Sequence, residues 1–206
     1  MGISMPSPPD KNAHQKELKQ DNSPQVREKI RLWIQNCVIE WNLCPFAKAP
    51  FYSGRVQIEV YQGSDPQELI EYVLTQAYRL LEWQKTHQQN HTTLIATPLG
   101  WSDFEEYWEC VGWLEDCFAG LGLEGKLQIA SFHPAYQFEG ESGVGMYSNR
   151  SPYPLFHLLL EDEVERQIEG FTGVDQIGES NRNTLEKLGL PIVQARLKQC
   201  GWTPPR

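Results

Sequence analysis

The chain has 206 residues, of which 40% are hydrophobic and 22% charged, and its formal net charge is −9. This length supplies one well-sized core. No segment approaches the ~20 consecutive apolar residues of a membrane-spanning helix, which argues against an integral membrane segment. Acidic residues outnumber basic ones 27 to 18, and no lysine or arginine occurs between Lys85 and Lys126. Such a surface repels phosphate backbones, so we expect no nucleic-acid partner.

The first 22 residues differ in composition from the rest of the chain. They mix charged residues with proline and glutamine and contain no apolar stretch, which is not typical of a secretory signal. We expect residues 1–22 to be a disordered tail and residues 23–206 to form a single globular domain.

The five cysteines show no C-x-x-C spacing. Cys37 and Cys44 are seven residues apart, as are Cys110 and Cys117, and on a continuous helix this spacing separates the Cα atoms by ~10 Å, beyond disulfide reach. Reduced thiols are therefore expected, and with them a cytoplasmic location.

The first predicted element is an amphipathic helix that begins at Ser23 and ends near Asn42, because apolar residues recur there at spacings of three and four. Pro45 and Pro50 then force an irregular segment. Cys44 lies where the helix gives way to this loop.

Three strand-like runs follow, at residues 56–60, 93–97 and 127–132. Two helices separate them, at residues 65–81 and 102–118, and each opens with capping-box spacing. About 35 residues from one strand to the next leave room for helical crossovers and hence for parallel pairing. We expect a single layered α/β domain with an α-β-α-β-α-β core and mainly parallel strands. An α+β sheet with mixed pairing is the alternative, because three strands do not fix the order.

The remainder of the chain is predicted to be helical after a long connection. A segment rich in glycine and aromatic residues spans 133–154, and an acidic helix follows near Leu155 to Glu169. Two short helices come after Ser180 and Pro191. We find no internal repeat and no second domain boundary.

His133 is the best functional candidate in the sequence. It follows the third predicted strand, and ligands of parallel α/β sheets bind beyond the carboxyl ends of the strands. Its imidazole could act as a base, an acid or a metal ligand. The alternative is a structural histidine that closes the strand end by hydrogen bonding.

Arg150 is the candidate for binding an anion. The segment from Asn149 to Pro154 is predicted to lead into a helix whose first amides are unpaired, with Arg150 beside them. We expect Asn149, Arg150, Ser151 and Tyr136 to bind the substrate. Alternatively, Arg150 pairs with one of the many acids and Ser151 only caps the helix.

Cys44 is a second catalytic candidate. Its position near a helix C-terminus raises the thiol pKa rather than lowering it, so a small buried hydrophobic role is the favoured interpretation. His157 and Glu161 are four residues apart and would share a helical face. Together with His133 they are candidate metal ligands, although no compact ligand motif supports a metal.

Three separated motifs, NLCPFA at residues 42–47, SFHP at 131–134 and NRSPYP at 149–154, resemble those of DUF1415, a family of proteins of unknown function. The resemblance covers about residues 25–190. It implies one domain in which the three motifs belong together, and it implies no established reaction, cofactor or catalytic residue.

Together these observations lead to three functional hypotheses. The first is a small enzyme that acts on an anionic small molecule, with His133 and Arg150 at the carboxyl end of the sheet. The second is a non-enzymatic factor for cofactor or protein assembly, with a protein partner. The third is a metal-dependent enzyme that uses His133, His157 and Glu161. Convergence of His133 and Arg150 with Cys44 or His157 on one pocket would favour the enzymes, and their separation would favour a binding protein.

Overall fold

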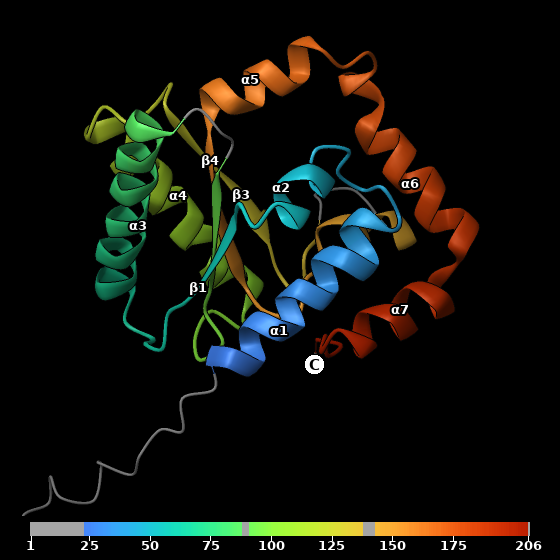
Figure 1. Ribbon diagram of the computed structural model, residues 1–206. Helices are drawn as coiled ribbons and strands as arrows, with labels where there is room; N and C mark the ends of the chain where they lie inside the picture. Colours follow the sequence, from blue (N-terminus) through green and yellow to red (C-terminus); the bar gives the residue numbers. More distant parts are fainter. Residues whose placement is uncertain (1–22, 88–90, 138–142, 206) are drawn as a thin grey trace, which may run out of the picture.

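The computed structural model describes residues 23–87, 91–137 and 143–205, so the predicted tail lies outside the described residues. The fold is α/β, with one mixed sheet that has helices on both faces (Figure 1). This arrangement confirms the predicted fold class. Within these three ranges, no helix is long and apolar enough to cross a membrane.

The sheet has four strands in the order β1-β2-β4-β3. Their bounds are Val56–Val60 for β1, Thr92–Ala96 for β2, Leu127–Phe132 for β3 and Leu155–Leu160 for β4. Strands β1 and β2 pair in parallel, whereas β4 pairs antiparallel with both β2 and β3. The three predicted strands are therefore confirmed and run in one direction. The expected parallel pairing of the second and third strands is wrong, because β4 lies between them.

The acidic helix predicted near Leu155 to Glu169 is wrong in its first six residues, which form strand β4. Residues 155–160 are extended, and helix α5 begins only at Glu161 and ends at Glu169. A central strand that is buried on both faces reads as a continuous apolar run, and periodicity alone does not distinguish such a run from a buried helix. His157 and Glu161 consequently do not share a helical face.

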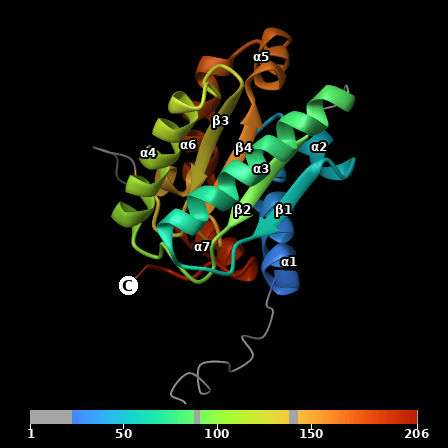
Figure 2. The ribbon, with the colours of Figure 1, turned by 90° about the vertical axis from the view of Figure 1, so that its left-hand side faces the viewer.

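One face of the sheet is covered by α3, Pro66–Thr86, and α4, Phe104–Gly120 (Figure 2). Both helices begin at a side-chain cap. The Asp65 carboxylate accepts the Glu68 amide at 2.9 Å, as predicted, and Asp103 rather than Ser102 caps α4 by accepting the Glu105 amide. Buried side chains of both helices pack there against the alternate residues Phe156, Leu158 and Leu160 of β4.

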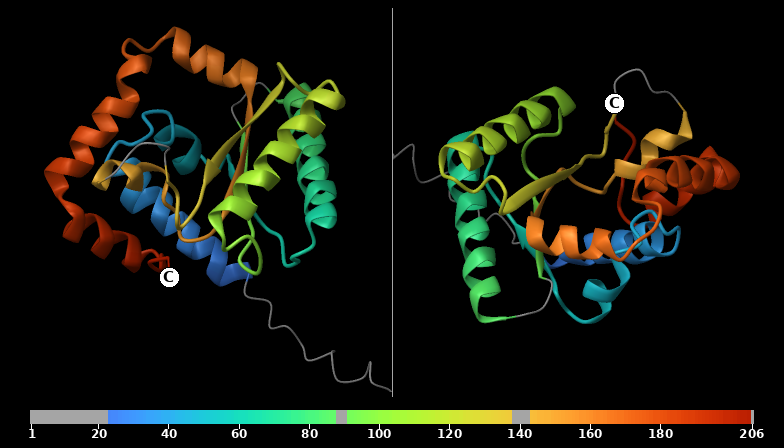
Figure 3. Two further views of the ribbon diagram at one scale, coloured as in Figure 1. Left: turned by 180° about the vertical axis from the view of Figure 1, so that it is seen from behind. Right: turned by 90° about the horizontal axis from the view of Figure 1, so that it is seen from above.

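The other face is covered by both ends of the described chain (Figure 3). Helix α1, Ser23–Trp33, continues as the π-helix η2, Ile34–Ile39, and is followed by the short α2, Lys48–Tyr52. The C-terminal half adds η3, Val144–Asn149, η4, Val174–Gln176, α6, Ile177–Leu188, and α7, Leu190–Gln199. Helix α5 connects β4 to this layer (Figure 1).

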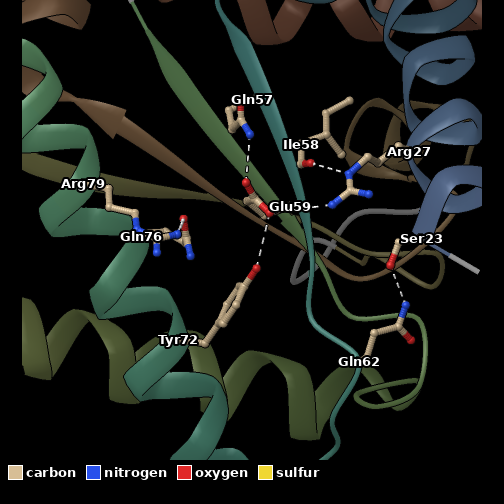
Figure 4. A network of polar contacts seen from close by, with 9 residues as sticks. All are labelled: Ser23, Arg27, Gln57, Ile58, Glu59, Gln62, Tyr72, Gln76 and Arg79. Atoms are coloured by element: carbon tan, nitrogen blue, oxygen red, sulfur yellow. Dashed lines mark hydrogen bonds and ion pairs between the residues drawn. The ribbon is translucent and has the colours of Figure 1, made fainter. Parts of the chain in front are cut away.

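A polar network covers the outer edge of β1 (Figure 4). The Arg27 Nε–H donates to the Ile58 carbonyl at 2.9 Å, so this carbonyl is not free to pair with another strand. The Arg27 guanidinium also lies 3.8 Å from Glu59. Glu59 accepts hydrogen bonds from Gln57 at 2.8 Å and from the Tyr72 hydroxyl at 3.4 Å. The network thereby joins α1 and α3 around the edge strand.

Candidate functional site

His133 directly follows β3 and is fully buried. Its Nδ1 accepts the Ala135 amide at 3.0 Å, and its Nε2 lies 2.9 Å from the Trp101 carbonyl. Because a carbonyl only accepts, Nε2 carries the proton. Burial lowers the pKa of His133, and the charge of Arg150 lowers it further. The imidazole is thus neutral with both nitrogens engaged, and its catalytic role stays a prediction that would require one of these bonds to open.

Trp101 shows what the His133 contact holds in place. Its φ is 55°, in the left-handed region that non-glycine residues seldom adopt. His133 bonds the carbonyl of this residue, immediately before the segment that caps α4. The histidine therefore stabilises the turn between β2 and α4.

Arg150 directly follows η3 and lies close to His133, but no helix begins directly after it. The segment after it leads into β4, so the predicted site on the first amides of a helix is wrong. The side chain is 7% exposed. Its Nε–H donates to the Tyr136 carbonyl at 3.3 Å, and its guanidinium lies 4.1 Å from the centroid of the Tyr147 ring. Within the described residues, no carboxylate lies within ion-pair distance of it.

The SFHP and NRSPYP motifs form one hydrogen-bonded unit. The His133 amide donates to the Asn149 carbonyl at 3.2 Å, and the Asn149 side-chain amide donates to the Ser131 carbonyl at 3.3 Å. Ser151 is buried and donates to the Tyr153 carbonyl at 2.6 Å. Asn149 and Ser151 therefore hold the backbone, and Tyr136 contributes its carbonyl to Arg150.

Cys44 and His157 lie elsewhere, on the wall of a cavity of about 250 Å³ that is partly open to solvent. Its lining residues come mainly from the sheet and from α1, η2, α2 and α5. Figure 1 shows how these elements are arranged. Most of its wall is apolar. The apolar lining residues are Trp33, Ile34, Val38, Phe46, Ala47, Pro50, Val56, Leu94, Ala130, Phe132, Leu159, Leu160 and Val164. The sequence-predicted residues are thus divided between two places: His133 with Arg150, and Cys44 with His157.

The hydrogen bonds of His157 fix its tautomer. Its Nε2 contacts the hydroxyl oxygen of Thr92, and that hydroxyl donates its single proton to the Leu158 carbonyl at 2.8 Å. With the hydroxyl proton on that carbonyl, Nε2 is the donor to Thr92 and Nδ1 is left as an unprotonated acceptor. No buried nitrogen or oxygen of a described side chain is without a partner, and the described residues offer Nδ1 none. We conclude that Nδ1 reaches the open space of the cavity.

The charge state of the cavity follows from its titratable residues. Burial lowers the pKa of His157 to about 4 and raises the pKa of the Cys44 thiol. The amides of Phe46 and Ala47 oppose the second shift only in part. Both side chains are therefore neutral near pH 7. For Cys44, burial rather than the end of the preceding helix is the main cause of the raised pKa.

Glu163 on α5 is a cavity residue that the sequence did not single out. Its side chain is 8% exposed and forms an ion pair with Arg166 at 2.5 Å. Among the described residues that line the cavity, none is a lysine or an arginine. The sequence did not single out Thr92 either. For Glu163 the only signal was the acidic composition of the predicted helix, and for Thr92 there was none.

The structure does not bring the predicted metal ligands together. Across the residues described, no three His, Cys, Asp or Glu side chains come together as a metal site would require. His133 is held by Trp101 and Ala135, whereas His157 faces the cavity.

Comparison with known proteins gives the family of the chain. No curated protein and no solved structure matches it significantly. The sequence model of a family described as "Protein of unknown function (DUF1415)" matches residues 25–195. This match covers most of the chain and includes all three motifs. The chain belongs to the DUF1415 family.

Proposed function

We propose that the protein binds a small, largely apolar molecule in the cavity between the sheet and the α1–η2 helix. The observation that supports this proposal is the cavity itself, whose wall is mostly apolar with a few polar atoms. Ligand sites in proteins have this composition. An apolar cavity of about 150 Å³ accepts benzene in another protein, so about 250 Å³ suffices for a substituted ring.

The division of the predicted site residues supports binding rather than catalysis. A catalytic histidine needs a nitrogen within reach of the substrate. His133 has both nitrogens engaged. His157 presents one nitrogen, but with a pKa of about 4 it is a weak base. A binding protein is therefore better supported than the proposed enzyme for anionic substrates.

Toluene is a suitable probe because it is uncharged and fits the volume. In a chemical-shift titration of the full chain, we expect it to shift the amide signals of cavity residues such as Ala130 and Leu159. Ala130→Phe places a ring in the cavity and should abolish these shifts. Ala119→Phe makes the same change at an exposed position and should leave them intact. Failure of toluene to bind the wild-type chain, or equal binding by Ala130→Phe, would overturn the proposal.

A second candidate function is binding of a small anion at Arg150. The supporting observation is a guanidinium that is nearly buried and, among the described residues, has no carboxylate beside it. Burial of an uncompensated charge is costly, and a bound phosphate, sulfate or acetate would offset this cost. At a hundredfold excess over Kd such an anion should stabilise the fold by ~2.7 kcal/mol.

Thermal melting tests this second candidate. One of the three anions should raise the Tm of the wild-type chain, and Arg150→Ala should abolish the increase. If none of the three anions shifts the Tm of the wild-type chain, Arg150 has a structural role alone and this candidate function is refuted.

A further inference from the structure

The cavity contains an unusual balance of hydrogen-bonding groups. The polar side chains on its wall are those of His91, Thr92, Gln128, His157, Glu163 and Gln167. The open Nδ1 of His157 and the carboxylate of Glu163 accept hydrogen bonds, whereas the two glutamine amides can both donate and accept. No positively charged side chain of the described residues lines it. Arg166 pairs with the Glu163 carboxylate but is not among the lining residues, so an anionic ligand would meet no cation on the described wall.

We infer that the cavity takes a ligand that carries a hydrogen-bond donor, a hydroxyl or an amine, on a small apolar body, and that Thr92 sets this preference through His157. The inference rests on the proposed binding function and goes beyond it by naming the ligand class and the residue that selects it.

The selection begins with the Thr92 hydroxyl. Its proton is used by the Leu158 carbonyl at 2.8 Å, so its oxygen receives the Nε2–H of His157. The imidazole can then offer only a lone pair to the cavity. A ligand with a hydrogen-bond donor can bond the lone pair of Nδ1, whereas a ligand with only acceptors leaves Nδ1 without a hydrogen bond.

The cross-strand neighbours of His157 place its imidazole among residues that line the cavity. His157 lies opposite Ala130 of β3 and opposite Leu94 of β2 in the sheet register, and both neighbours line the cavity. Small and aliphatic side chains beside the imidazole offer no competing donor. No hydrogen bond joins Nδ1 to a described residue, so a ligand or water can supply the donor.

Phenol, anisole and toluene share one ring and test this inference by chemical-shift titration near pH 7. Phenol has a hydroxyl donor, anisole an ether acceptor and toluene neither. We expect phenol to bind about three- to tenfold more tightly than anisole, the factor that corresponds to one neutral hydrogen bond. Benzoate, which has the same ring and a negative charge, should bind most weakly. Equal affinity for phenol and anisole, or tighter binding of benzoate, would overturn the inference.

Two variants of Thr92 test its positioning role. Thr92→Val keeps the shape but removes the acceptor of the Nε2–H, so the preference for phenol over anisole should fall toward one. Thr92→Ser restores a hydroxyl and should restore the preference. A preference that survives in Thr92→Val shows that Thr92 does not select the ligand and contradicts the inference.

A measurement without ligand separates this inference from the proposed function. The nitrogen chemical shifts of His157 in the free protein should report a proton on Nε2, and Thr92→Val should redistribute it. A proton on Nδ1 in the wild-type chain would overturn the donor preference even if toluene binds. If the proton is on Nε2 but none of the three uncharged rings binds, the proposed function fails and the ligand class fails with it.

Discussion

Replacing His157 should change how stability depends on pH. The pKa of this side chain is about 4 in the folded protein and 6.5 in its ordinary state. Between these values the unfolded chain binds a proton that the folded chain does not. Stability attributable to His157 is therefore complete above pH 6.5 and is lost as the pH falls toward 4. For these two pKa values the loss between pH 7.5 and pH 5 is about 2 kcal/mol.

Urea denaturation at pH 7.5 and pH 5 measures this loss. In His157→Gln the decrease in unfolding free energy between the two pH values should be smaller than in the wild-type chain by about 2 kcal/mol. His157→Leu should show the same reduction, because it also removes the titrating group. Since glutamine retains a donor for Thr92 and leucine does not, the difference between the variants at pH 7.5 combines the hydrogen bond with the cost of burying the amide. If both variants keep the wild-type pH dependence, His157 is not held neutral by burial and our account of the cavity is wrong.

Four further predictions concern the fold. Tyr107→Phe removes the hydroxyl that donates to the Leu155 carbonyl at 2.6 Å and accepts the Phe132 amide at 3.1 Å, and should cost about 1–3 kcal/mol in urea denaturation; no loss would refute this role. Leu158→Ala in the buried centre of β4 should cost about 2–5 kcal/mol, whereas Leu99→Ala at an exposed position should change stability by less than about 0.5 kcal/mol. Thiol titration of denatured protein kept from air should find five free cysteines, and a count of three would indicate that Cys37 and Cys200, whose thiols share a hydrogen bond, had paired. A chain that begins at Ser23 should melt within a few degrees of the full chain, because residues 1–22 have little apolar content to bury; a large drop in Tm would contradict the domain boundary.

Local signals in the sequence predicted the elements that they control. Asp65 followed by Pro66 and Glu68 is a strong helix start, and α3 begins there with the expected bond to the Glu68 amide. The alternation of apolar and polar residues in Val56–Val60 predicted a strand, and β1 has these bounds. In these cases the interactions that decide the structure lie within a few residues of one another.

The long-range parts of the structure could not be predicted in this way. Residues 155–160 carry no turn signal before Glu161, so the apolar run and the amphipathic helix after it read as one element. The hydrogen-bond partners of the site residues could not be predicted either. The state of His157 depends on Thr92, which lies 65 residues away in the sequence, and no pattern around either residue indicates the contact. The resemblance grouped the three motifs, but it could not indicate that NLCPFA lines the cavity while the other two pack together.

The place of β4 has a consequence for synthesis of the protein. This strand completes the middle of the sheet, yet it is the last strand to leave the ribosome. The 28 residues that follow Phe132, up to and including Leu160, take about 1 to 6 s to translate. During that interval β2 and β3 each have an apolar edge with no strand to pair with, and such edges associate readily with other chains. The nascent chain is therefore most vulnerable to aggregation just before its fourth strand emerges, and slower translation of this stretch would lower the yield of folded protein.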